Sequence, residues 1–136
     1  MRTLGIDFGD KNIGLAVSDA LNLTAQGLGL YRKQGRHADL AYFQDLVKQY
    51  QINRIVVGLP LRMDGTHGSR AEKTREFAAW LETSLSLPVI LWDERLTTKE
   101  AFRILREQSA THKAKKSRKD QIAASLILAS YLETVR

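Results

Sequence analysis

Three acidic features of this 136-residue chain lie in apolar surroundings, where a carboxylate is costly. Asp7 interrupts the apolar stretch that opens the chain, Asp93 and Glu94 follow the apolar run 87–92, and Asp120 lies on the apolar face predicted for the last helix. A buried charge is tolerated when it is paired, hydrogen-bonded or bound to a metal. Each acid has its own structural explanation: a backbone hydrogen bond for Asp7, pairing with Arg95 for Asp93 or Glu94, and the helix dipole for Asp120. Their coincidence instead favours one shared site.

Carboxylates that converge on one point repel each other, so they need cations between them. Ligation by oxygen alone favours Mg²⁺ or Mn²⁺. Two such ions, roughly 3.5–4 Å apart, can clamp the attacking and leaving oxygens of a phosphoryl displacement. This chemistry needs no side-chain nucleophile, which suits a chain with no cysteine and three histidines. The acids therefore predict hydrolysis of a phosphodiester by a pair of metal ions.

The first acid is expected in a β-hairpin. Two apolar runs, 4–8 and 13–17, flank a turn at Gly9-Asp10-Lys11-Asn12. A turn centred on Asp10 and Lys11 pairs Phe8 with Ile13, Asp7 with Gly14 and Gly5 with Ala16. Asp7 would then stand on a face of the sheet that glycine and alanine leave clear of large side chains.

The remaining elements are predicted from periodicity and capping signals. A weak strand at 24–31, expected at a sheet edge, precedes a helix capped by Asp39 and ending near Tyr50. A buried strand at 52–58 leads through a loop, 59–68, to a helix opened by a Ser69/Glu72 capping box. Another buried strand follows at 87–92, then helices at about 97–107 and 117–135, the first opened by a Thr97/Glu100 capping box.

This order predicts an α/β fold with a mixed five-stranded sheet, in which three antiparallel strands precede two βα units and helices cover both faces. Ligand sites in open α/β sheets form outside the carboxyl ends of the strands. Asp7 and the Asp93-Glu94 pair would converge there if the first and last strands run parallel. Strand parity does not choose between Asp93 and Glu94.

Composition limits the class of protein. The length predicts one domain over residues 1–136 with a proper hydrophobic core. The absence of cysteine excludes a disulfide framework, thiolate catalysis and a zinc–sulfur site. No apolar run approaches the roughly 18 residues that a membrane span requires, and no signal peptide is visible. A cytoplasmic protein with no membrane partner is therefore expected.

The net charge of +6 favours a polyanionic partner. Much of it comes from the segment 113–119, which is predicted to be a loop that contacts nucleic acid and leads into the helix carrying Asp120. Further phosphate contacts are expected in or just after loops at the active edge. The basic candidates are Lys11, Arg62, Arg70, Lys73, Arg95, Lys113, Lys115, Lys116, Arg118 and Lys119. No aromatic stacking platform is predicted, since Trp80 and Trp92 are interpreted as core residues.

Four segments carry a family resemblance that runs nearly end to end. They are Asp7-Phe-Gly-x-Lys-x-Ile-Gly-x-Ala-Val-Ser-Asp19, Val57-Gly-Leu-Pro-Leu-x-Met-Asp-Gly65, Trp92-Asp-Glu-Arg-Leu-Thr-Thr98 and Asp120-Gln-Ile-Ala-Ala-Ser-Leu-Ile-Leu128. Together they resemble the YqgF/RuvX family, which implies an RNase H-like fold related to the RuvC resolvases. The resemblance also implies a catalytic and metal-binding set of Asp7, Glu94 and Asp120, and so selects Glu94 over Asp93. The chain departs from many relatives at Asn12, where a basic residue is common.

The resemblance implies a metal-dependent nuclease, with 5′-end processing of pre-16S rRNA in ribosome biogenesis as the first interpretation. The alternatives are a Holliday junction resolvase acting in DNA recombination, which would need a two-fold dimer, and a non-catalytic RNA-binding assembly factor. A monomer or a homodimer is expected. The Asp7-x-Gly-x-x-x-x-Gly14 hairpin also resembles the phosphate loop of the actin and sugar-kinase superfamily. That interpretation is disfavoured because those proteins enclose ATP with a second domain.

Overall fold

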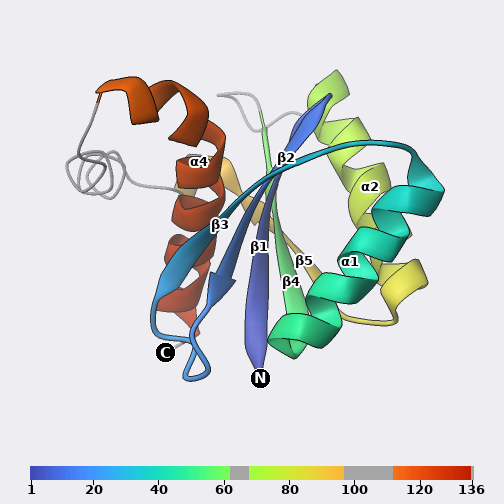
Figure 1. Ribbon diagram of the computed structural model, residues 1–136, viewed down its shortest axis with the longest axis horizontal. Coiled ribbons are helices and arrows are strands. Elements are labelled where there is room, and N and C mark those ends of the chain that lie inside the picture. Colours follow the sequence, from blue (N-terminus) through green and yellow to red (C-terminus); the bar gives the residue numbers. More distant parts are fainter. Residues whose placement is uncertain (62–67, 97–111, 136) are drawn as a thin grey trace.

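The computed structural model describes residues 1–61, 68–96 and 112–135, with side chains in the last range described from Ile122 onward. Its centre is one five-stranded sheet of order β3-β2-β1-β4-β5 (Figure 1). The strands are β1 (Arg2–Phe8), β2 (Asn12–Ser18), β3 (Ala25–Arg32), β4 (Ile52–Leu59) and β5 (Val89–Asp93). The first three are antiparallel neighbours, while β4 runs parallel to both β1 and β5. The predicted mixed sheet is confirmed, and β3 lies at an edge as expected.

The hairpin that carries Asp7 has the predicted register. Asp7 pairs with Gly14, Phe8 with Ile13 and Gly5 with Ala16. The turn is closed by the Gly9 backbone N–H, which donates to the Asn12 carbonyl at 3.1 Å. Because side chains alternate along a strand, Asp7 and Phe8 point to opposite faces of the sheet.

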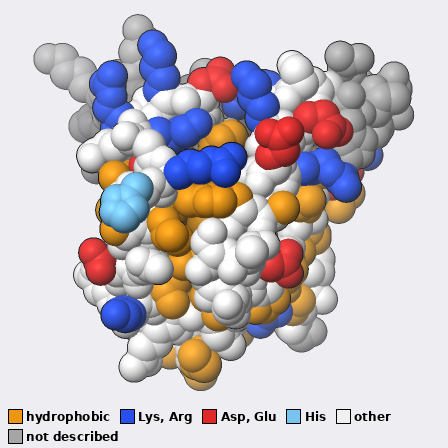
Figure 2. Space-filling view, turned by 90° about the vertical axis from the view of Figure 1, so that its right-hand side faces the viewer, with side chains coloured by type: hydrophobic (Ala, Val, Ile, Leu, Met, Phe, Trp, Pro, Cys, Tyr) orange, Lys and Arg blue, Asp and Glu red, His pale blue; other side chains and the backbone are white. Residues whose placement is uncertain are grey.

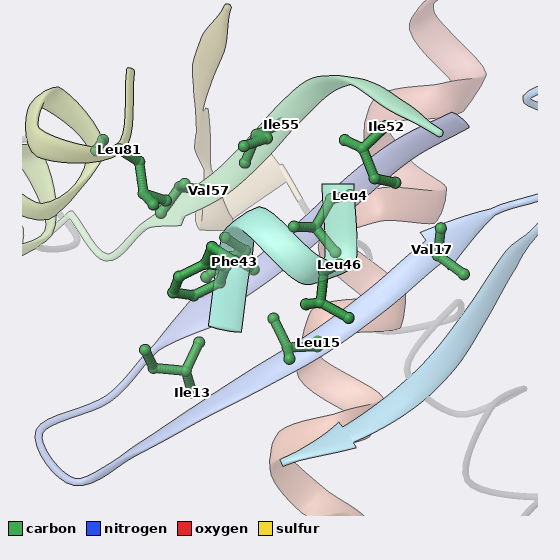
Figure 3. Close-up of a cluster of buried hydrophobic side chains, with 12 residues drawn as sticks. Leu4, Ile13, Leu15, Val17, Phe43, Leu46, Ile52, Ile55, Val57 and Leu81 are labelled. Carbon is green, nitrogen blue, oxygen red and sulfur yellow. The ribbon is translucent and has the colours of Figure 1, made fainter. Parts of the chain in front are cut away.

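Helices cover both faces, as predicted. Figure 1 shows α1 (Arg36–Tyr50) and α2 (Ser69–Leu85) on one side of the sheet and α4 (His112–Thr134) on the other. On the first side, Phe43 and Leu46 of α1 and Leu81 of α2 pack on aliphatic side chains from β1, β2 and β4 (Figure 3). On the second side, α4 packs Ile127, Leu128 and its neighbours against β2 and β4. Helix α4 therefore covers the face to which Asp7 points.

Two helix starts differ from the prediction. The N-caps of α1 and α2 are Gly35 and Gly68, glycines that have no capping side chain, instead of Asp39 and Ser69. Asp39 lies one turn inside α1 and is buried. Its Oδ1 accepts hydrogen bonds from the Tyr31 hydroxyl at 2.7 Å and from the Gln34 backbone N–H at 2.9 Å. The acid therefore ties the end of β3 to α1.

The last helix also starts earlier than predicted. It begins at His112 rather than near Ser117, so the basic segment 113–119 is helical and not a loop. Alanine and lysine are good helix formers, which explains why the helix extends through this segment. The helix predicted at 97–107 lies outside the described residues. None of the helices in the described ranges combines the length and hydropathy of a bilayer-spanning segment.

Candidate active site

Asp7 is the next-to-last residue of β1 and is partly buried. Two residues earlier, on the same face, Gly5 lies directly under α4. A Cβ on Gly5 would lie 2.7 Å from Leu128 Cβ and 3.2 Å from the Ala124 carbonyl oxygen. The small residues beside Asp7 therefore serve the close approach of a helix, and they leave Asp7 near the end of the face that the helix covers.

Glu94 follows β5 directly and opens a short 3₁₀ turn, η1 (Glu94–Leu96). Its carboxylate occupies space above Gly58 in the neighbouring strand β4. A Cβ on Gly58 would lie 2.7 Å from Glu94 Oε1 and would also collide with Ile127 Cδ1. Any larger residue at 58 would displace Glu94 or α4. Sequence reasoning missed this role, although a glycine ending a β-branched strand is a signal of close packing.

The electrostatics link Glu94 to Asp7. Burial, and then the negative charge of Asp7, raise the pKa of Glu94 to about 7, with Asp93 adding a smaller effect and Arg70 opposing it. Desolvation and like charge both disfavour the ionised form of a carboxyl. Strand β4 separates β1 from β5, yet the two carboxyls interact across its end because β1, β4 and β5 are parallel.

Asp93 lies in a different environment from its neighbour. Its Oδ2 pairs with Arg95 Nη2 at 2.8 Å, and its Oδ1 accepts the Arg95 backbone N–H at 2.9 Å. These hydrogen bonds lower the pKa of Asp93. The two adjacent acids are therefore distinguished by structure: Asp93 is held by Arg95, and Glu94 interacts with Asp7.

A hollow of about 210 Å³ opens beside Asp7. It is lined by Asp7, Gly9, Asp10, Lys11, Asn12 and Arg70. Lys11 comes from the β-hairpin turn and Arg70 from the first turn of α2. Two of the predicted phosphate contacts thus lie within one hollow with the first acid, so its lining carries two positive charges beside the carboxylates of Asp7 and Asp10.

The other predicted site residues are more dispersed. Lys73 lines a second, larger hollow, and Arg95 is engaged with Asp93. Arg62 lies outside the described residues. Asp120 and the basic residues of segment 113–119 lie in the N-terminal half of α4, where the structure describes the backbone alone. The N-terminus of β1 and the C-terminus of α4 lie at one end of the molecule, so the Asp7 end of β1 and the start of α4 share the other (Figure 1).

The donor set fits a hard divalent cation. Among residues with described side chains, no three of the His, Cys, Asp and Glu type form a metal-binding group. Asp7 and Glu94 nevertheless provide two interacting carboxyls, and α4 brings the backbone of Asp120 toward the same end of the sheet. Burial of Glu94 beside a like charge is costly without a cation. Oxygen ligands of this kind suit Mg²⁺ or Mn²⁺.

Comparison of the sequence with known families gives a match over nearly all of the chain. The model described as "RuvX: Holliday junction resolvase" matches residues 1–134. A protein of Koribacter versatilis described as "Putative pre-16S rRNA nuclease" is 49% identical over 132 residues, which is 97% of this chain and 86% of the relative. One of Halothermothrix orenii with the same description is 46% identical over 132 residues, 97% of this chain and 94% of the relative.

Solved structures show the same fold at low identity. RuvC of T. thermophilus in complex with a Holliday junction substrate superposes with a TM-score of 0.63 at 15% identity, covering 99% of this chain and 96% of that one. The Fowlpox virus resolvase in complex with Holliday junction DNA gives a TM-score of 0.60 at 14% identity, with 99% of each chain covered. The predicted relation to the RuvC fold is confirmed.

Proposed function

Because the chain belongs to the RuvX family, we propose that it is a metal-dependent endonuclease of the cytoplasm that processes the 5′ end of pre-16S rRNA. The observation that carries the proposal is the pair formed by Asp7 and the buried Glu94, next to Lys11 and Arg70. The rRNA substrate is favoured because the relatives described as pre-16S rRNA nucleases are 46–49% identical over nearly the whole chain.

Asp7, Glu94 and Asp120 would hold Mg²⁺ or Mn²⁺ at the carboxyl ends of β1 and β5. When bound, two such ions supply Lewis acidity to a phosphodiester and lower the pKa of water. The protein's own residues do the remaining work. Lys11 and Arg70 bind the substrate phosphate beside Asp7. Glu94 must lose its proton before it can act as a ligand.

Junction resolution is the second candidate, because the matching family model is described by that activity and the fold is that of RuvC. A resolvase cuts two strands symmetrically, so it would require a homodimer that presents two copies of the site. The two functions share the same carboxylates and differ in the shape of the substrate and in the number of chains.

The test is cleavage of two labelled substrates, a pre-16S rRNA 5′ fragment and a four-way DNA junction, in Mg²⁺, Mn²⁺ or EDTA. Wild type is compared with Asp7→Asn and Glu94→Gln, and with Asp93→Asn as the matched control that neutralises the neighbouring acid. We expect metal-dependent cutting of the RNA, abolished in Asp7→Asn and Glu94→Gln and largely kept in Asp93→Asn.

Other outcomes contradict parts of the proposal. Paired symmetric cuts in the junction, with the RNA intact, would replace the rRNA nuclease by a dimeric resolvase. No cutting of either substrate, with RNA binding unchanged in Asp7→Asn, would leave a non-catalytic assembly factor. Equal loss of activity in Asp93→Asn and Glu94→Gln would show that the assignment of roles within this acidic pair is wrong.

A further inference from the structure

A second hollow, of about 540 Å³, lies on the α1 and α2 side of the sheet. Its lining is Phe8, Asp10, Lys33, Gly35, Arg36, Asp39, Lys73, Glu76, Phe77 and Trp80. Asp10 also lines the smaller hollow beside Asp7, so the two hollows adjoin across the hairpin turn. Figure 2 faces this side and shows hydrophobic side chains bordered by Lys, Arg and acidic side chains. The sequence pattern does not indicate this hollow.

Three aromatic rings belong to its lining. Phe8 stacks on Phe77 with ring centroids 4.2 Å apart and planes at 23°, and Phe77 lies 5.9 Å from Trp80. All three rings pack on the core cluster but remain partly exposed. The prediction that Trp80 belongs to the core is confirmed in part, since its ring packs on the core cluster while some of it stays exposed. Trp80 is at once an edge of the core and a wall of the hollow.

Two cations already lie against these rings. Lys33 Nζ is 4.5 Å from the centre of the Phe8 ring, and the Arg36 guanidinium carbon is 5.9 Å from the centre of the Trp80 ring. The electron-rich faces of aromatic rings attract cations, and the same faces can stack on other flat groups. Guanidinium groups and aromatic rings are the groups on which proteins stack unpaired bases.

The charges of the hollow balance. Its lining has three basic residues, Lys33, Arg36 and Lys73, and three acidic ones, Asp10, Asp39 and Glu76. A net positive hollow would favour a phosphate. A balanced one whose lining includes aromatic rings instead favours a flat, neutral ligand that both donates and accepts hydrogen bonds. A nucleobase has these properties.

We propose that this hollow binds one unpaired nucleobase of the strand whose backbone enters the Asp7 site. The inference rests on the proposed function, since it takes a nucleic acid as the substrate. A base sandwiched between two flat groups needs about 3.5–4 Å on each side, or roughly 7–8 Å in all. The Arg36 guanidinium carbon lies 5.9 Å from the centre of the Trp80 ring, about 1–2 Å short of that spacing. The Arg36 side chain is exposed, so it can move outward by this amount.

Binding of a base in this hollow would require that the substrate be unpaired next to the phosphate at the Asp7 site. A base within a duplex has both faces stacked and must be unstacked before a protein ring can reach it. Lys11 and Arg70 would hold the backbone phosphate while the base turns past Asp10 into the hollow. The Asp7 site would then favour a phosphate next to a single-stranded or distorted segment over one within a regular duplex.

The test uses tryptophan fluorescence, in EDTA so that cleavage plays no part. The chain has two tryptophans, and Trp92→Phe leaves Trp80 as the single reporter. This variant is titrated with a short oligoadenylate, with the matching ribose-phosphate strand that has no bases, and with duplex RNA of equal length. We expect the oligoadenylate to quench Trp80 fluorescence and the other two strands to leave it unchanged.

Affinity for labelled oligoadenylate is then compared among variants of the complete chain. Trp80→Leu should weaken binding about 5- to 150-fold, the range that corresponds to losing one stacked base. Arg36→Gln, at an exposed position that does not threaten folding, should weaken it more than Lys48→Gln, which removes the same charge from the far end of α1. Equal affinities in Arg36→Gln and Lys48→Gln, together with no quenching, would overturn the proposal.

Base binding in the hollow can be tested independently of the cleavage activity. Quenching that persists in a protein that cuts neither substrate would support base binding in the hollow and refute only the catalytic activity. Metal-dependent cleavage that is equally fast in Trp80→Leu, together with no quenching of Trp80 fluorescence, would overturn base binding in the hollow. The proposed nuclease activity would then still stand.

Discussion

Glu94→Gln should stabilise the metal-free protein at alkaline pH, although it removes a residue proposed to be catalytic. Burial and the charge of Asp7 raise the pKa of Glu94 from 4.5 to about 7. Between these values the folded protein binds a proton that the unfolded chain has released, so stability falls as the pH rises through this window. Above pH 7 the folded protein bears the full free-energy cost of an ionised Glu94. One pKa unit is about 1.4 kcal/mol, so the penalty is about 2–3 kcal/mol once solvent screening is allowed for.

The assay is urea unfolding of wild type and Glu94→Gln in EDTA at pH 5 and pH 8. At pH 5 the wild-type carboxyl is mostly protonated when folded, and the variant should gain less than about 1 kcal/mol. At pH 8 it should gain about 2–3 kcal/mol. Glu82→Gln, an exposed position on α2, controls for the loss of one negative charge.

Addition of Mg²⁺ at pH 8 should stabilise wild type more than Glu94→Gln, because the ion binds the ionised carboxylate of the folded state. A stability difference that is the same at both pH values would refute the inference that Glu94 is buried beside Asp7. Destabilisation by Glu94→Gln at pH 8 would refute it more directly, since it would mean that the ionised carboxylate is favourably paired in the metal-free protein.

Three further predictions concern other parts of the molecule. Gly58→Ala should lower turnover at least tenfold and cost about 1–3 kcal/mol of stability, because the new Cβ would collide with Glu94 and Ile127; turnover equal to wild type in the cleavage assay would contradict this. Tyr31→Phe should cost about 1–2 kcal/mol in urea unfolding, since the buried Asp39 then accepts one hydrogen bond fewer, and an unchanged midpoint would show that the bond adds nothing. Replacing the five basic residues of segment 113–119 by Gln should weaken RNA binding and reduce its salt dependence. The slope of log binding constant against log salt concentration should fall by about 0.7–0.9 for each phosphate that is no longer neutralised. An unchanged slope would mean that the RNA does not contact this segment.

Local patterns in the sequence predicted the hairpin that carries Asp7 down to its register. Side-chain alternation has a period of two, so the position of the turn determines which residues face each other. The order of strands and helices likewise predicted the mixed sheet and its helices on both faces. The same local signals were less reliable at helix ends: glycines cap α1 and α2, and Asp39 bonds to Tyr31 instead. A side chain that could cap a helix can instead hydrogen-bond to a residue of another element, as Asp39 does with Tyr31.

The sequence by itself determined which residues are candidates for chemistry, because an acid inside an apolar stretch stands out without any structure. The different environments of Asp93 and Glu94 were decided by the tertiary structure, through the turn after β5 that aims one acid at Arg95 and the other at Asp7. The space that Gly58 leaves for Glu94, and the aromatic hollow between β1 and α2, were decided there as well. Alternation and periodicity act over a few residues, whereas the shape of a site depends on side chains that are distant in sequence and meet only when the sheet and its helices pack.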